Sequence, residues 1–322
     1  MFDAYRRQIA YLRLSLTSAC QMRCSYCRPE WLTNRCGVDQ LTPEELETVV
    51  RHMVNRHGVH KVRLTGGDPT ARPDLLEIIR RLALIPGLRD LAMTTNGLTL
   101  HRMAQAYADA GLNRVNVSLD SLDPDQFASI TGVDGLHLVL RGIEAAEQAG
   151  LTPIKINTVV LRDSNHDQLP ELVRFAAEHQ ACIRFIELMP MGPLASQWHE
   201  RYVSANEMQQ RLSEVVCDWR DRPQGSDSAK VFDAVLDDGS TVDIGFITPM
   251  SCNFCHACDR LRLTSEGKIY PCLMDISRGS ILPAVRPSFD PDRFDTILSD
   301  ALAEKAPEHP AQGKTVMTQI GG

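Results

Sequence analysis

Short apolar segments alternate with helix-like segments about six times along the first part of the sequence, and this alternation limits the possible folds most strongly. The apolar segments are rich in β-branched residues and predict strands at residues 12–17, 62–65, 91–95, 115–119, 154–160 and 183–188. Between them, helices are predicted to open at Thr42-Pro43 and Pro73-Asp74 and to cover residues 104–110, 138–149 and 169–177. Parallel strands joined by crossover helices give this order. We expect an α/β fold, a partial (β/α)6 barrel of the TIM type, rather than an open sheet.

Polar or glycine-rich turns follow three of the predicted strands. Their sequences are Thr65-Gly66-Gly67-Asp68, Thr94-Thr95-Asn96-Gly97 and Ser118-Leu119-Asp120-Ser121. In β/α barrels, functional residues collect at the C-terminal ends of the strands. We therefore expect these turns to face one cavity.

The strand–helix rhythm ends near Trp198, so we divide the chain into a barrel at residues 1–198 and a smaller α+β region at residues 199–322. In the second region we predict a helix at 206–216, a surface loop at 220–230, and hairpins at 231–247 and 261–270. The hairpins are expected to turn at residues 237–239 and 265–267. Residues from Pro307 onward predict a mobile tail, because they have little to bury.

Composition excludes several classes of protein. Hydrophobic residues make up 43% and charged residues 23% of the chain, which suits a packed core and does not match disorder. No apolar run approaches the roughly 18 residues of a membrane span, and the first residues lack a signal-peptide core. The net charge of -7 argues against nucleic-acid binding by the whole surface. We expect a cytoplasmic protein without membrane or nucleic-acid partners.

Ten cysteines are the most informative residues for function. In a reducing compartment, clustered thiols hold metals or react more often than they form disulfides. One group is Cys20, Cys24 and Cys27, and a second contains Cys252, Cys255, Cys258 and Cys272. Cys36, Cys182 and Cys217 are isolated, and we interpret them as ordinary thiols.

The first group places three thiols in a loop directly after the first strand. Structural zinc sites use four protein ligands, and simple electron-transfer [4Fe-4S] clusters usually use four cysteines. Three cysteines would leave one iron open to another ligand, which is typical of catalysis. The alternative is a zinc loop with a distant fourth ligand.

The second group also offers three thiols, Cys255, Cys258 and Cys272, with Arg260 and Arg262 on one strand face between them. The planar fork of arginine suits phosphate, so an anionic ligand is expected beside this group. The alternative is a zinc ribbon that uses Cys252 as the fourth ligand.

The first group, within CQMRCSYC, resembles the radical S-adenosylmethionine (SAM) enzymes. In that superfamily the open iron of a [4Fe-4S] cluster binds SAM, whose cleavage yields a 5′-deoxyadenosyl radical. Gly66-Gly67-Asp68-Pro69 resembles the superfamily's GGEP turn, which holds the SAM amino group. The carboxylate of Asp68 is one methylene shorter than that of the usual glutamate.

Almost the whole chain is similar to the GTP 3′,8-cyclase family of molybdenum cofactor biosynthesis. The matching segments include LRLSLTSAC, KVRLTGGDPTARPDL, RVNVSLDSLDPDQFASITG, FCHACDRLRLTSEGKIYPCL and the terminal Gly321-Gly322. The resemblance implies a partial barrel and a C-terminal region whose second [4Fe-4S] cluster binds the guanine of GTP. Asp259 replaces the more usual asparagine, and Cys252 is extra relative to the family's pattern.

The resemblance also implies site residues, position by position. Cys20, Cys24 and Cys27 would hold the first cluster, and Cys255, Cys258 and Cys272 the second. Contacts to SAM are implied for Tyr26, Gly67, Asp68, Ser118 and Met189, and contacts to GTP for Arg13, Arg63, Thr94, Lys155, Arg260 and Arg262. Catalytic roles are implied for Arg260, Arg262, Gly321 and Gly322.

The implied reaction is the lyase-class conversion of GTP to (8S)-3′,8-cyclo-7,8-dihydroguanosine 5′-triphosphate. The radical would remove hydrogen from C3′ of the ribose, and the C3′ radical would attack C8 of guanine. The implied partners are a reductant such as flavodoxin or ferredoxin and the next pathway enzyme, cyclic pyranopterin monophosphate synthase, with the chain a monomer or homodimer. The alternatives are a radical SAM enzyme that modifies a peptide, and a non-catalytic zinc or iron–sulfur protein that binds a nucleotide.

Overall fold

The computed structural model describes residues 1–32, 40–223, 225 and 227–321, so Cys36 and Gly322 lie outside the described residues. The strands are β1 (Tyr11–Ser15), β2 (Lys61–Thr65), β3 (Asp90–Thr95), β4 (Arg114–Ser118), β5 (Lys155–Val160), β6 (Cys182–Glu187), β7 (Val216–Asp221), β8 (Ala229–Leu236), β9 (Thr241–Ile247), β10 (Arg260–Thr264) and β11 (Ile269–Tyr270). The α-helices are α1 (Pro43–His57), α2 (Leu75–Ala83), α3 (Leu100–Asp109), α4 (Pro124–Thr131), α5 (Leu136–Gln148), α6 (Leu169–Glu178), α7 (Trp198–Arg201), α8 (Ala205–Leu212), α9 (Leu282–Val285), α10 (Pro291–Ala303) and α11 (Met317–Ile320).

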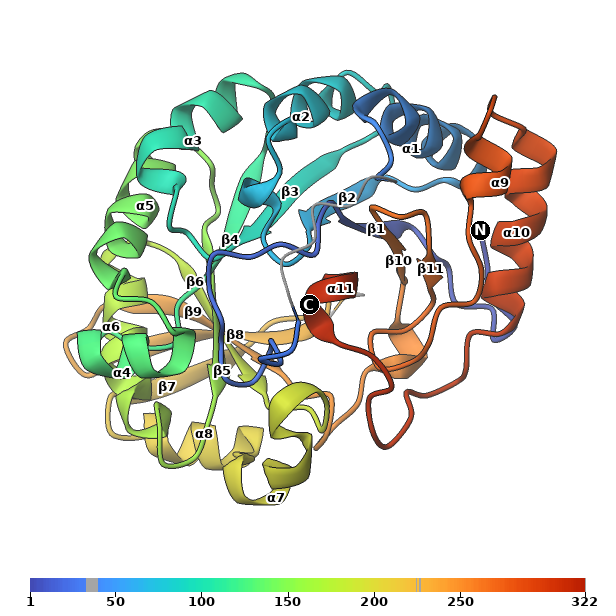
Figure 1. Cartoon of the computed structure of the whole chain (residues 1–322). Coiled ribbons are helices and arrows are strands. Elements are labelled where there is room, and N and C mark those ends of the chain that lie inside the picture. The colour runs from blue at the N-terminus through green and yellow to red at the C-terminus, as the bar shows by residue number, and fades with distance from the viewer. Residues whose placement is uncertain (33–39, 224, 226, 322) are drawn as a thin grey trace.

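All strands belong to one sheet with the order β11-β10-β1-β2-β3-β4-β5-β6-β9-β8-β7. Strands β1 to β6 are parallel and neighbours in chain order, as the sequence predicted. The C-terminal region adds β10 in parallel beside β1 and β9 in parallel beside β6. The sheet is curved but is not closed by hydrogen bonds, so the predicted partial barrel is confirmed (Figure 1).

Local sequence explains why the helices form where they do and cover the sheet. Thr42 and Glu45 make a capping box at the start of α1, and Gly58 ends this helix in the left-handed conformation. The apolar faces of α1, α2, α3, α5 and α6 contribute to the same core as the parallel strands, most of whose residues are buried. Figure 1 shows α1, α2, α3, α5 and α6 around the outside of the curved sheet. The C-terminal ends of the strands are thereby left for the site.

Both predicted hairpins are present, but three predictions for the C-terminal region are wrong. The predicted helix at 206–216 ends at Leu212, and the predicted loop at 220–230 contains the end of β7 and the start of β8, which pair antiparallel. The tail predicted to be mobile is held against the body, because Gly313 and Lys314 donate their amides to the carbonyls of Pro190 and Met274 and Arg262 donates to the carbonyl of Gly321; α11 lies inside the curve of the sheet (Figure 1). Within the described part of the chain, no helix combines the length and apolar character that a membrane span requires.

Candidate functional site

One cavity of about 310 Å³ opens at the C-terminal ends of the barrel strands, and both cysteine groups line it. This volume lies at the lower end of the usual range for small-molecule sites. The three strand-end turns singled out in the sequence also contribute residues to its wall, as expected. The predicted site residues that line it are Arg13, Cys20, Cys24, Tyr26, Cys27, Arg63, Gly67, Asp68, Thr94, Ser118, Met189, Cys255, Cys258, Arg260, Arg262 and Cys272.

The glycine turn after β2 packs directly against the backbone that leads into the first cysteine loop. The amide of Gly67 donates to the carbonyl of Thr17 at 2.7 Å, and the amide of Asp68 donates to the carbonyl of Ala19 at 2.8 Å. A Cβ atom on Gly67 would lie 2.3 Å from the Ala19 carbonyl oxygen. Glycine is therefore required for this approach, which positions Cys20.

The carboxylate of Asp68 is buried and accepts hydrogen bonds at both oxygens. Its donors include the Thr70 amide at 2.9 Å, the Thr95 hydroxyl at 3.0 Å and the Asn96 amide at 2.6 Å. Burial raises the pKa of Asp68, and these hydrogen bonds oppose the rise. The side chain joins the ends of β2 and β3, so its predicted contact with SAM would add to a structural role.

Tyr26 and Asp120 form a buried pair beside the first cysteine group. The Tyr26 hydroxyl donates to the Asp120 carboxylate at 2.8 Å, and the Val159 amide donates to the other carboxylate oxygen at 2.9 Å. Burial raises the pKa of Asp120 to about 6, and the Tyr26 hydrogen bond limits the rise. Sequence reasoning placed Asp120 in a strand-end turn but gave it no role.

The thiols of the first group are strongly desolvated. Burial raises the pKa of Cys20 to about 11 and that of Cys27 to about 12, and it raises the pKa of Cys24 well above its usual value. Because ligand thiols must lose their protons, metal binding at this loop is coupled to proton release.

The second group differs because cations surround it. Burial would raise the pKa of Cys258, but the charges of Arg260 and Lys305 outweigh it and lower the pKa to about 7. Cys252 is exposed and is absent from the cavity wall, unlike Cys255, Cys258 and Cys272. The cavity therefore brings together three cysteines of this group.

The thiols of neither cysteine group lie as close together as the ligands of a single zinc ion. Around a tetrahedral zinc with bonds of about 2.3 Å, ligand sulfurs lie about 3.8 Å apart. Among the described residues, three candidate ligand atoms lie within 4.8 Å of one another only at His52, His57 and Asp295, and at neither cysteine group. A [4Fe-4S] cluster binds each thiolate through a different iron and does not require the thiols to lie this close together.

Three arginines form a row across neighbouring strands of the cavity wall. Arg13 on β1 is in register with Arg262 on β10 and with Arg63 on β2. Burial and repulsion from the other arginines lower the pKa of Arg13 well below its usual value, and burial and Arg260 lower the pKa of Arg262 to about 10. Like charges buried together favour a polyanionic ligand.

Several buried polar atoms near this row lack a hydrogen-bond partner among the described residues. They are Arg63 Nε, Thr94 Oγ1, Asn157 Oδ1 and Arg184 Nε, and all four residues line the cavity. Such atoms are costly unless a ligand satisfies them. Sequence reasoning predicted Arg63 and Thr94 and missed Asn157 and Arg184, which are adjacent in register on β5 and β6. Side chains alternate between the two faces of a strand, and Asn157 and Arg184 both lie on the face toward the cavity. This alternation could have identified them from the sequence.

Lys155 belongs to the residues predicted to bind GTP, but it does not line the cavity. It is the first residue of β5, at the end opposite the cysteine loops. Burial, followed by Arg184 and Arg114, lowers the pKa of Lys155 to about 8. Its contact with GTP remains a prediction.

The chain end reaches the arginine row. Arg262 Nη1 donates to the carbonyl of Gly321 at 2.7 Å. Gly321 has a φ of +78°, and a Cβ atom there would lie 2.3 Å from Thr65 Cγ2. The described terminal glycine therefore lies beside an arginine of the row.

Models of two families match the chain in succession. The radical SAM superfamily matches residues 14–176, and a family described as Molybdenum Cofactor Synthesis C matches residues 181–311. The chain is 40% identical over 329 residues to a GTP 3′,8-cyclase from Moorella thermoacetica and 38% identical over 330 residues to one from Alkaliphilus oremlandii, with 100% of each chain covered in both cases. A GTP 3′,8-cyclase 1 from Pseudomonas aeruginosa is 44% identical over 271 residues, which cover 84% of this chain and 82% of the relative.

Solved structures agree with this result at the level of the fold. Streptococcus suis SuiB bound to the precursor peptide SuiA matches with a TM-score of 0.60 and 14% identity, covering 93% of this chain and 74% of SuiB. SuiB bound to S-adenosylmethionine matches with a TM-score of 0.59 and 15% identity, covering 93% and 75%. These identities show the fold alone. The family models and the full-length relatives show that the chain belongs to the radical SAM superfamily and, within it, to the GTP 3′,8-cyclase family.

Proposed function

We propose that this chain is a GTP 3′,8-cyclase that makes (8S)-3′,8-cyclo-7,8-dihydroguanosine 5′-triphosphate in the first step of molybdenum cofactor biosynthesis. When bound, the first [4Fe-4S] cluster and SAM supply a 5′-deoxyadenosyl radical for removal of the C3′ hydrogen of GTP. The observation that carries the proposal is one cavity lined by two three-cysteine groups and a row of buried arginines. The first cysteine group suits SAM chemistry, and the arginines suit a triphosphate.

Each predicted site residue has a proposed task. Cys20, Cys24 and Cys27 hold the first cluster, and Tyr26, Gly67, Asp68, Ser118 and Met189 surround SAM. Cys255, Cys258 and Cys272 hold the second cluster, which binds guanine. The residues proposed to bind GTP are Arg13, Arg63, Thr94, Lys155, Arg260 and Arg262, with Arg260, Arg262 and the terminal glycines acting during the reaction.

The arginines would do most of the work of holding the substrate. A triphosphate carries several negative charges, and the buried guanidinium groups of Arg13, Arg63 and Arg262 would pair with them in a cavity of low dielectric. This pairing would offset the burial and the mutual repulsion that together lower the pKa of Arg13. Held at both ends, the ribose would be fixed for attack at C3′.

We also propose the barrel and C-terminal regions at residues 1–198 and 199–322 as the two functional units of this site. A low-potential reductant such as flavodoxin or ferredoxin would supply electrons, and cyclic pyranopterin monophosphate synthase would take the product. The cytoplasmic location and the monomeric or homodimeric state remain predictions.

The test uses protein with both clusters reconstituted without oxygen and supplied with dithionite, SAM and GTP deuterated at C3′. Mass spectrometry should detect 5′-deoxyadenosine that carries deuterium, together with a cyclised GTP product. Cys24→Ala should abolish SAM cleavage, while Cys217→Ala, at an exposed thiol of β7, should leave it intact.

The outcomes separate the possible functions. Unlabelled 5′-deoxyadenosine without a cyclised nucleotide would keep the radical SAM chemistry but refute GTP as substrate and return attention to peptides. No SAM cleavage in cluster-loaded protein would refute the enzyme proposal. Cleavage retained in Cys24→Ala would refute the assignment of the first cluster.

A further inference from the structure

Lys305 is a buried lysine that lies against the second cysteine group. The residue lies two positions beyond the end of α10 and is only 4% exposed. The ammonium lies 3.7 Å from Cys258 Sγ and donates to the carbonyl of Arg260 at 3.1 Å. It also donates to the carbonyl of Pro271, which directly precedes Cys272. One cation thus joins two of the three cysteine segments.

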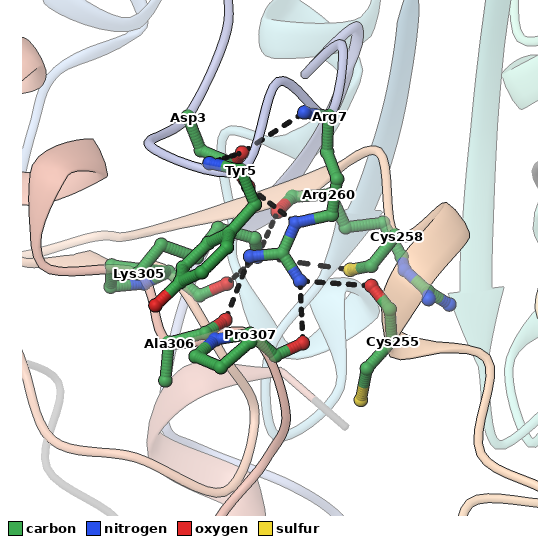
Figure 2. A network of polar contacts seen from close by, with 10 residues as sticks. Asp3, Tyr5, Arg7, Cys255, Cys258, Arg260, Lys305, Ala306 and Pro307 are labelled. Carbon is green, nitrogen blue, oxygen red and sulfur yellow. Dashed lines mark hydrogen bonds and ion pairs between the residues drawn. The ribbon is translucent and has the colours of Figure 1, made fainter.

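Arg7 holds the third cysteine segment and the backbone that follows Lys305. It is also buried, and its guanidinium donates to the carbonyl of Cys255 at 2.8 Å, of Ala306 at 2.7 Å and of Pro307 at 2.9 Å. Asp3 accepts from Arg7 Nε at 2.5 Å and so neutralises this arginine. Figure 2 shows the Arg7 guanidinium between the Cys255 loop and the chain at residues 305–307.

The charge of Lys305 has a different partner from that of Arg7. No carboxylate of the described residues lies within ion-pair distance of its ammonium, although burial of an isolated ammonium is costly. A group that can carry negative charge, the Cys258 thiol, lies 3.7 Å from the ammonium and becomes a thiolate when it ligates iron. The site therefore suits an anionic cluster in place of a carboxylate.

We propose that Lys305 and Arg7 form a clamp that positions the ligands of the second cluster, and that the charge of Lys305 raises the reduction potential of this cluster. The clamp consists of the two side chains and the carbonyls and thiol that they contact. A positive charge and an N–H···S hydrogen bond stabilise the more negative, reduced cluster over the oxidised one. The inference rests on the proposed function, because it requires Cys255, Cys258 and Cys272 to hold a cluster. Lys305 acts through Cys258 and is a positioning residue.

The same clamp helps to fix the position of the chain end relative to the second cysteine group. Residues 305–307 are held by the clamp, and the segment after them leads to α11 and to the contact between Gly321 and Arg262. The clamp thus ties cluster geometry to the position of the chain end.

The test measures the midpoint potential of the second cluster by a redox titration followed by electron paramagnetic resonance. The full chain is used with Cys20, Cys24 and Cys27 replaced by alanine, so that only the second cluster contributes. Lys305→Met removes the charge at similar length, Lys305→Gln keeps a neutral donor, and Lys305→Arg keeps the charge. The matched control is Lys268→Met, at an exposed lysine paired with Glu266.

We expect Lys305→Met to shift the reduction equilibrium at least tenfold toward the oxidised cluster, which is a fall of about 59 mV for one electron. Lys305→Gln should show most of that fall, Lys305→Arg should retain more than half of the wild-type effect, and Lys268→Met should not differ from the parent. Folded Lys305→Met protein that fails to hold iron, while the other variants hold it, would also support the clamp. If Lys305→Met does not fold, Lys305→Gln decides the question.

An unchanged potential in loaded Lys305→Met or Lys305→Gln would overturn the clamp while leaving the proposed function intact. A parent protein with intact Cys255, Cys258 and Cys272 that contains no second cluster would overturn both proposals. Iron and sulfide analysis of the parent protein separates these two results before the variants are compared.

Discussion

Gly321→Ala tests whether the docked chain end takes part in the reaction. The substitution places a Cβ atom 2.3 Å from Thr65 Cγ2 and puts a side chain at a φ of +78°. This positive-φ conformation costs about 1–2 kcal/mol for an L-residue. Displacement of the carbonyl from Arg262 costs about 1.5–3 kcal/mol more, the value of a hydrogen bond to a charged group.

These two terms sum to about 2.5–5 kcal/mol, or roughly a 60-fold to 4000-fold loss of the docked chain end. We expect kcat/KM for GTP to fall by at least the lower figure, while SAM cleavage continues without cyclisation. The measurement is the ratio of cyclised nucleotide to 5′-deoxyadenosine, determined by liquid chromatography and mass spectrometry.

A compensating change separates the clash from the backbone strain. Thr65→Ser removes Cγ2 and keeps the hydroxyl, so the double variant should recover the Arg262 hydrogen bond but retain the strain at φ. The defect should then shrink to roughly 5-fold to 30-fold, relative to Thr65→Ser alone. Wild-type coupling in Gly321→Ala, or no recovery in the double variant, would refute the reasoning.

Three further perturbations follow from the site and its surroundings. Arg260→Ala removes a charged donor from the cavity and should weaken GTP binding roughly 10-fold to 150-fold, with uncoupled SAM cleavage retained; unchanged affinity in equilibrium binding would contradict this. Gly67→Ala should halve the iron content after reconstitution, because the new Cβ meets the backbone before the first cysteine loop; full iron loading would contradict it. Burial lowers the pKa of His57 from its usual 6.5, so the unfolded chain binds more protons and the free energy of unfolding should fall as pH drops below about 6.5. Urea titrations at several pH values should show this fall in the parent and a smaller one in His57→Gln, and a parent that gains stability toward acid would contradict it.

The barrel was predictable because its signal is strong and local. Each buried parallel strand is an apolar run, and Thr42 with Pro43 marks the start of α1. The turns at residues 237–239 and 265–267 identified both hairpins. The two groups of three cysteines were also predictable, because thiols that are closely spaced along a loop can converge. In the structure both groups line the cavity.

The errors arose where side-chain composition carries little information. Strand β7 is an edge strand with mostly exposed, charged residues, so its sequence resembles a loop. The C-terminal segment docks through the carbonyls of Ala306, Pro307 and Gly321, and any residue has a carbonyl. Arg7 was overlooked because a lone arginine in a sequence is usually a solvated side chain, and the carbonyls that it contacts leave no signal in the sequence.

The way the sheet is completed has a consequence for biogenesis. Strands β9 and β10 cover the two open edges of the barrel, beside β6 and β1, yet they are synthesised after the whole barrel. During translation, the edge of β1 that pairs with β10 stays unpaired until residues 260–264 have left the ribosome. Such long-range parallel pairing is slow, and an unpaired edge is prone to intermolecular association. Truncation within the last third of the gene should therefore yield aggregation rather than a soluble half-barrel.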